Sequence, residues 1–142
     1  MKTIYDNDTF FETIKPLLND NQAVSFVVKG TSMKPFLKDG QTEVFLKAKE
    51  AYKPLDMCLF KFNQKYVLHR LIKINDKYIF RGDALYTYEQ VDQKDILAYV
   101  YQYQMKHIMV RTEAFIYKFK VRCYLFAKAI KLMLRSMVKG KK

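Results

Sequence analysis

The stretch VSFVVKGTSMKPFLKDGQTEV, residues 24–44, contains two strand signals separated by a polar turn. The apolar run before Gly30 predicts a short buried strand, and residues 43–46 predict a second one. Ser32 lies between them, where Gly30 and Pro35 favour a tight turn. A serine held at a strand end suits a nucleophile, although the same residues also suit an ordinary turn. The rest of the chain has to distinguish these two interpretations.

The segments around this stretch predict one mainly β domain over residues 1–111. Residues 9–18 carry apolar side chains at helical spacing, so a helix that packs on a sheet is expected there. After residue 44, short apolar runs alternate with turns, which indicates an antiparallel β core. Further strands are expected at residues 57–62, 66–74, 78–80, 95–103 and 108–110, with turns at 63–65, 75–77 and 106–107.

From Thr112 onward the spacing becomes helical, and residues 112–142 form the second predicted unit. One face of this helix is basic, and the opposite face is apolar. Such a helix can lie on an anionic membrane surface, or it can pack on its own β domain or on a second copy. The predicted apolar face consists of Phe115, Phe119, Phe126, Ile130, Met133, Leu134 and Met137.

Composition narrows the compartment and the partners. Of the net charge of +12, residues 112–142 hold +8, and no RNA- or DNA-reading motif accompanies them, so a nucleic-acid partner is not favoured. The chain has no secretory signal and no apolar run long enough for a transmembrane helix. We therefore expect a cytoplasmic protein, either free or peripheral at the inner face of the membrane, in which Cys58 and Cys123 are free thiols. No metal-ligand spacing occurs, and neither a metal nor a cofactor is predicted.

Three polar residues stand at predicted strand ends: Ser32, His69 and Asp83. A serine hydroxyl needs a base beside it, and histidine, with an ordinary pKa of about 6.5, is a suitable one. A carboxylate on the far ring nitrogen would fix the tautomer of that histidine. The residue types therefore fit acyl transfer, although spacing alone does not bring them together.

The order of these segments resembles the S24/S26 serine peptidase superfamily, which includes type I signal peptidases and self-cleaving repressors of the LexA type. Four boxes over residues 24–100 carry the resemblance, followed by a closing strand. They are GTSMKPFLKDG at 30–40, LDMCLF at 55–60, YVLHRL at 66–71, RGDA at 81–84 and ILAYV at 96–100. The chain departs from the family pattern at Leu55, Ala84 and Ala98.

The resemblance implies a signal peptidase-like or LexA-like β fold and a catalytic set of Ser32, His69 and Asp83. Ser32 would be the nucleophile, its backbone N–H would help to bind the oxyanion, and Asp83 would orient His69. Met33 and Pro35 would contact the substrate, a peptide or leader. The expected activity is that of a serine endopeptidase. The alternative is a catalytically inactive peptide-binding module of the same fold.

Overall fold

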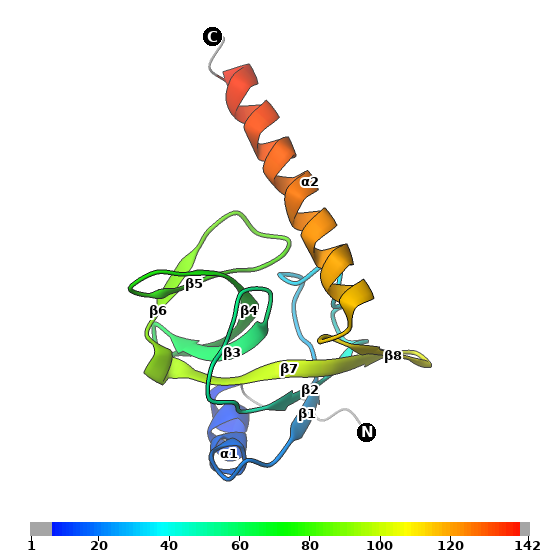
Figure 1. Cartoon of the computed structure of the whole chain (residues 1–142). Coiled ribbons are helices and arrows are strands. Elements are labelled where there is room, and N and C mark those ends of the chain that lie inside the picture. The colour runs from blue at the N-terminus through cyan, green and yellow to red at the C-terminus, as the bar shows by residue number, and fades with distance from the viewer. Residues whose placement is uncertain (1–6, 140–142) are drawn as a thin grey trace.

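The computed structural model describes residues 7–139, and the side chains of residues 9–139. Its body is an antiparallel sheet in which the strands follow the order β1-β2-β7-β3-β4-β5-β6, with β8 paired to β7 (Figure 1). The prediction of a mainly β fold with a helix at each end is confirmed. The elements are α1 (Asn7–Asn19), β1 (Val24–Val27), β2 (Glu43–Lys47), β3 (Met57–Phe62), β4 (Lys65–Ile74), β5 (Tyr78–Arg81), β6 (Glu89–Val91), a 3-10 turn (Gln93–Asp95), β7 (Ile96–Met105), β8 (Ile108–Arg111) and α2 (Phe115–Lys139).

The β3–β4 hairpin shows how local sequence sets the register. Asn63 and Gln64 both take positive φ values, 49° and 66°, as a two-residue hairpin turn requires. This turn pairs Phe62 with Lys65 and, at the far end, Met57 with Arg70. Because side chains alternate along a strand, His69 and Arg70 point to opposite faces of β4.

The sheet encloses apolar side chains in two clusters, one on each face of β3 and β4. The larger cluster joins α1 to the sheet and to the start of α2, through residues such as Leu18, Leu46 and Val121. The smaller one contains Phe60, Phe80 and Leu71 and lies on the side of β4 toward which His69 points. The candidate acid Asp83 follows β5, and a second acid, Glu89, opens β6; both strands contribute to the smaller cluster.

The long helix α2 docks on the β domain, which is one of the placements that the sequence leaves open. Tyr117 and Val121 are buried, and Lys128 is 6% exposed, so these residues form the docked side. The predicted apolar face is real but lies on the far side, where Phe115 is 78% exposed and Phe126 is 69% exposed. Figure 1 shows the last turns of α2 extending beyond the sheet. Neither α2 nor any other helix within residues 7–139 is long and apolar enough to span a membrane.

Candidate active site

Ser32 occupies a turn between β1 and β2 and is partly exposed. Gly30 enters this turn with a φ of +93°, which favours glycine, and its N–H donates to Asp39 Oδ1 at 2.8 Å. The Ser32 carbonyl oxygen accepts a hydrogen bond from the Ala84 N–H at 2.9 Å. The turn that carries Ser32 is thereby attached to the loop that follows β5.

His69 lies in β4 and is 8% exposed. Its Nδ1 contacts Glu89 Oε1 at 2.5 Å, and its ring packs edge-on against Phe60. Glu89 belongs to β6 and pairs with Phe80 of β5, which in turn pairs with Leu71 of β4, two residues from His69. Because the carboxylate accepts the Nδ1 proton, the second ring nitrogen, Nε2, remains the one that can accept a proton.

Gly82 brings the Ser32 turn and the His69 ring to one place. A Cβ atom built on Gly82 would lie 2.8 Å from the Ser32 carbonyl oxygen and 3.1 Å from His69 Nε2. Because both distances are measured from the same Cβ position, the Ser32 carbonyl oxygen and His69 Nε2 are separated by no more than the sum of the two distances. No hydrogen bond joins the Ser32 hydroxyl to the His69 ring in the part of the chain that is described. The structure thus gathers two of the three predicted catalytic residues around Gly82.

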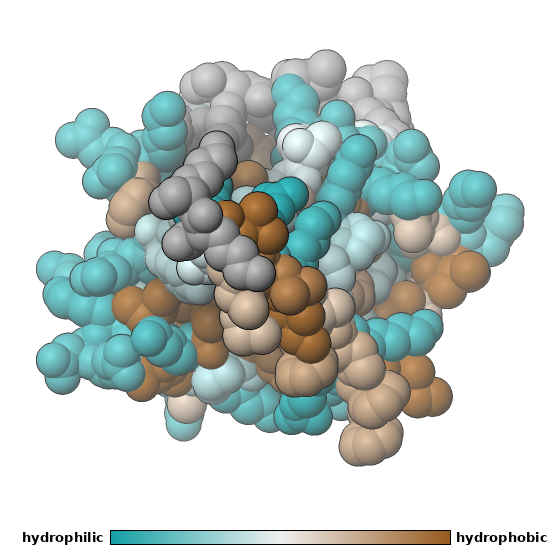
Figure 2. Space-filling model, turned by 90° about the horizontal axis from the view of Figure 1, so that it is seen from above, coloured by the Kyte–Doolittle hydropathy of each residue, from teal (hydrophilic) through white to brown (hydrophobic). Residues whose placement is uncertain are grey.

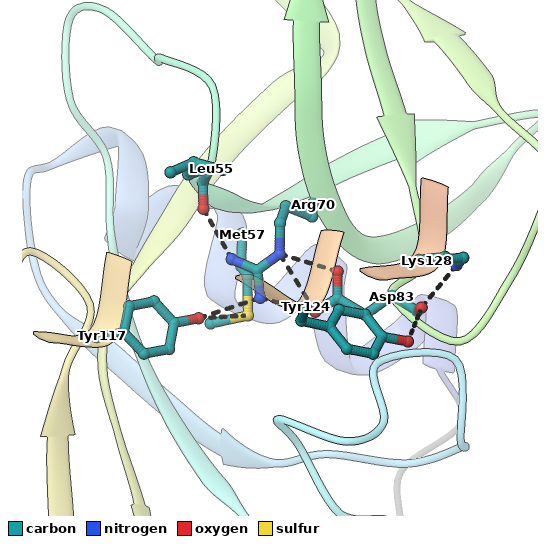
Figure 3. Close-up of polar contacts among 7 residues, drawn as sticks. All are labelled: Leu55, Met57, Arg70, Asp83, Tyr117, Tyr124 and Lys128. Carbon is teal, nitrogen blue, oxygen red and sulfur yellow. Dashed lines mark hydrogen bonds and ion pairs between the residues drawn. The ribbon is translucent and has the colours of Figure 1, made fainter. Parts of the chain in front are cut away.

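Asp83 does not contact His69, and the prediction that it orients this ring is corrected. Its carboxylate accepts from Arg70 Nε at 2.9 Å and from Arg70 Nη2 at 2.7 Å (Figure 3). Both side chains of this ion pair are fully buried. The reason is the alternation along β4, because the carboxylate lies on the Arg70 face while Glu89 lies on the His69 face. Glu89 therefore takes the position that the sequence assigned to Asp83.

The Arg70 guanidinium ties four parts of the chain together. Besides Asp83, Arg70 donates to the Leu55 carbonyl oxygen at 2.8 Å and to Tyr117 Oη at 3.1 Å. Burial by itself lowers the pKa of Arg70, but the charges of Tyr117 and Asp83 outweigh it and leave the pKa raised. Leu55 has a φ of +84°, a backbone conformation that favours glycine. It is one of the positions at which the chain departs from the pattern of the family that it resembles.

Helix α2 also forms hydrogen bonds to the loop that follows β5. The Asp83 carbonyl oxygen accepts from Tyr124 Oη at 2.6 Å and from Lys128 Nζ at 2.7 Å (Figure 3). Lys128 also donates to the Leu85 carbonyl oxygen. Burial, and then the nearby charge of Arg81, lowers the pKa of Lys128 from 10.5 to about 8. The docked side of α2 thus fixes the same loop that bonds to Ser32.

The two predicted substrate contacts are placed differently. Met33 is 2% exposed and belongs to the larger core cluster, so its predicted role in substrate binding is wrong. Pro35 is exposed, and its role stays a prediction. Glu89 is the residue that the sequence did not assign to the site, because it lies in β6, a three-residue strand that the sequence does not predict. The one signal in the sequence was that Glu89 is the nearest acid after Asp83.

Comparison with protein-family models and with curated proteins finds no match for this chain. The chemistry of this chain therefore has to be inferred from the residues of the site.

A surface cavity of about 540 Å³, lined by residues such as Lys15, Lys49 and Lys94, contains none of the candidate catalytic residues. Within residues 9–139, no three His, Cys, Asp or Glu side chains gather as metal ligands. The candidate site is therefore the turn with Ser32, which lies near His69, and the His69 Nδ1 atom is bonded to the Glu89 carboxylate.

The different roles of Asp83 and Glu89 predict different stability losses. Asp83→Asn leaves the buried Arg70 without a charged partner and is expected to lower the free energy of unfolding by about 3–5 kcal/mol. Glu89→Gln keeps an acceptor for His69 Nδ1 and should cost at most about 1.5 kcal/mol. Urea denaturation measures both losses. Equal losses, or a larger loss for Glu89→Gln, would contradict this division of roles.

The close approach at Gly82 predicts that a single added methyl group disturbs the site. In Gly82→Ala the new Cβ is too close to the Ser32 carbonyl oxygen, so the backbone must shift at a cost of about 1–3 kcal/mol. The His69 ring signals in an NMR spectrum should move as well. Gly40→Ala is the matched control, since its cost comes from a φ of +71° with no atom within 4 Å of the added Cβ. Unchanged His69 signals in Gly82→Ala would contradict the prediction.

Proposed function

We propose that the protein is a serine endopeptidase in which Ser32 is the nucleophile and His69 is the general base. The orientation of the His69 ring is the observation that supports this most directly, because Glu89 holds Nδ1 while Nε2 lies toward Gly82 and the Ser32 turn. A carboxylate at Nδ1 fixes the tautomer and stabilises the imidazolium that forms when Nε2 accepts a proton. Glu89 therefore takes the orienting role in this proposal.

In the proposed reaction, Ser32 Oγ attacks the carbonyl carbon of the scissile peptide bond and its proton passes to His69 Nε2. Among the described residues, the Ser32 N–H donates no backbone hydrogen bond, so it is available to the oxyanion. His69 then gives the proton to the leaving amine as the C–N bond breaks. Water, activated by the same nitrogen, hydrolyses the resulting serine ester and regenerates the hydroxyl.

The proposed substrate is a peptide or leader that binds in extended form. A strand edge offers unpaired backbone groups to such a peptide. β6 lies at one end of the strand order and carries Glu89, so its edge is next to the proposed catalytic residues. The exposed Pro35 is expected to contact the same peptide.

A second candidate function is that of a peptide-binding module with the same fold and no catalytic turnover. The absence of a hydrogen bond between Ser32 and His69 among the described residues favours it. Catalytic hydrogen bonds are often long in the absence of substrate and tighten only when it binds. A binding module would instead keep this separation permanently. The two candidates differ in whether the Ser32 hydroxyl reacts.

Labelling with a serine-directed fluorophosphonate distinguishes the two. Wild-type protein should label, Ser32→Ala should not, and Glu89→Gln should label about 100-fold or more slowly because His69 loses its orienting charge. Ser136→Ala, on the exposed part of α2, is the matched control and should label normally. Labelling that survives in Ser32→Ala would exclude Ser32 as the nucleophile. No labelling of the wild type would favour the binding module.

We also propose that the exposed face of α2 rests on an anionic membrane surface. Figure 2 shows brown, apolar side chains gathered along α2 with teal, hydrophilic ones around them. Phe119 is 57% exposed and Met137 is 56% exposed, and exposed lysines such as Lys120 and Lys131 lie along the same helix. Apolar side chains that enter the interface, together with lysines that reach acidic head groups, stabilise this kind of contact.

Vesicle binding tests this proposal. The double variant Phe119→Ser/Phe126→Ser removes two large apolar contacts and should weaken binding to phosphatidylglycerol-containing vesicles at least about tenfold. Its free energy of unfolding should change by no more than about 0.5 kcal/mol per site, because both side chains are exposed. Leu17→Ser, an exposed leucine on α1, is the control. Binding equal to wild type in the double variant would contradict the proposal.

A further inference from the structure

Two buried cations, Arg81 of β5 and Lys128 of α2, have no carboxylate partner among the described residues. Arg81 is 7% exposed and Lys128 is 6% exposed. Neither forms an ion pair with any carboxylate of residues 9–139. Asp83 is the acid nearest in sequence to Arg81, but its carboxylate is fully committed to Arg70. The region therefore carries two buried positive charges that the described chain does not neutralise.

The partners that these cations do have are neutral oxygens. Arg81 Nη1 donates to Tyr88 Oη at 2.8 Å, whereas the buried Arg81 Nε has no hydrogen-bond partner. Lys128 donates only to the backbone carbonyl oxygens of Asp83 and Leu85. An unpaired buried charge costs free energy, and so does an unsatisfied buried donor. Burial, and then the charge of Arg81, lowers the pKa of Lys128, because both disfavour the charged form of this side chain.

We propose that Arg81, Lys128 and Tyr88 form a binding site for a phosphate group. A guanidinium can bind two phosphate oxygens at once, and an ammonium acts as a point charge on a third. Up to two negative charges on a phosphate match the two positive charges of the site. The Tyr88 ring lies over Arg81, with its centroid 5.1 Å from Cζ, and the residue is 53% exposed. Rotation of this surface side chain uncovers the guanidinium.

The phosphate can belong to a lipid head group or to a free phosphate, since both present the same oxygens. Cationic side chains of α2 gather beside the site, because Arg135 and Lys128 both lie over the Tyr86 ring, at 5.8 and 4.6 Å from its centroid. The site does not depend on the proposed peptidase chemistry, because its residues lie on the Arg70 side of the β4–β5 pair.

The first test is thermal unfolding in inorganic phosphate against chloride at equal ionic strength. Wild-type protein should show a saturable rise of about 5 °C, as expected for a ligand that binds only the folded state. Arg81→Gln should abolish the rise, while Arg111→Gln, an exposed arginine on β8, should retain it. A rise that persists in Arg81→Gln, or no rise in the wild type, would overturn the proposal.

A measurement on the unmodified chain covers the case in which Arg81→Gln does not fold. In a phosphate titration followed by NMR, the Arg81 Nε–H signal should shift saturably and the Arg111 Nε–H signal should stay in place. No movement of the Arg81 signal would overturn the proposal.

Vesicles of phosphatidylcholine with phosphatidic acid then identify the source of the phosphate. If Arg81→Gln loses both the phosphate response and at least about tenfold of its vesicle affinity, the site binds a lipid head group. If only the phosphate response is lost, the site takes a free phosphate. The Phe119→Ser/Phe126→Ser variant should keep the phosphate response, which separates this site from the apolar membrane contact. Loss of the response in that variant would overturn the assignment to Arg81 and Lys128.

Discussion

The buried ion pair between Arg70 and Asp83 determines how the other polar groups of the molecule are distributed. Both side chains are fully buried, and separating them would leave a charge in the core. The guanidinium reaches Leu55 before β3 and Tyr117 of α2, while the Asp83 main chain reaches Tyr124 and Lys128. Sheet, loop and helix therefore meet at this pair, and the Asp83 carboxylate is bonded to Arg70 on the face of β4 that points away from His69.

The histidine depends on a second, separate acid for that reason. His69 and Arg70 are neighbours in sequence, yet they point to opposite faces of β4, so each has its own carboxylate. Glu89 reaches His69 from β6, and Gly82 lets the Ser32 turn approach from the other side. The proposed active site is thus built on the face away from the ion pair, while the loop between them belongs to both.

The two faces of helix α2 carry two different proposed roles. The docked face supplies Tyr124 and Lys128 to the loop that bears Asp83. Among the described residues, the buried Lys128 and Arg81 form no ion pair with a carboxylate. The opposite face exposes large apolar side chains along most of the helix. The proposed phosphate site and the proposed membrane contact therefore lie on opposite faces of one helix.

The sequence by itself determined the antiparallel sheet, the β3–β4 hairpin and the two helices, because alternation, turn residues and helical spacing are local properties. It also predicted a turn at Ser32, but it placed His69 at a strand end, whereas His69 lies inside β4. It did not show that Glu89 rather than Asp83 would meet His69, since β6 has only three residues and its position depends on pairing with β5. Nor did it show which face of α2 would dock. Only the tertiary structure decided these points, because a buried arginine takes the acid on its own face of the sheet.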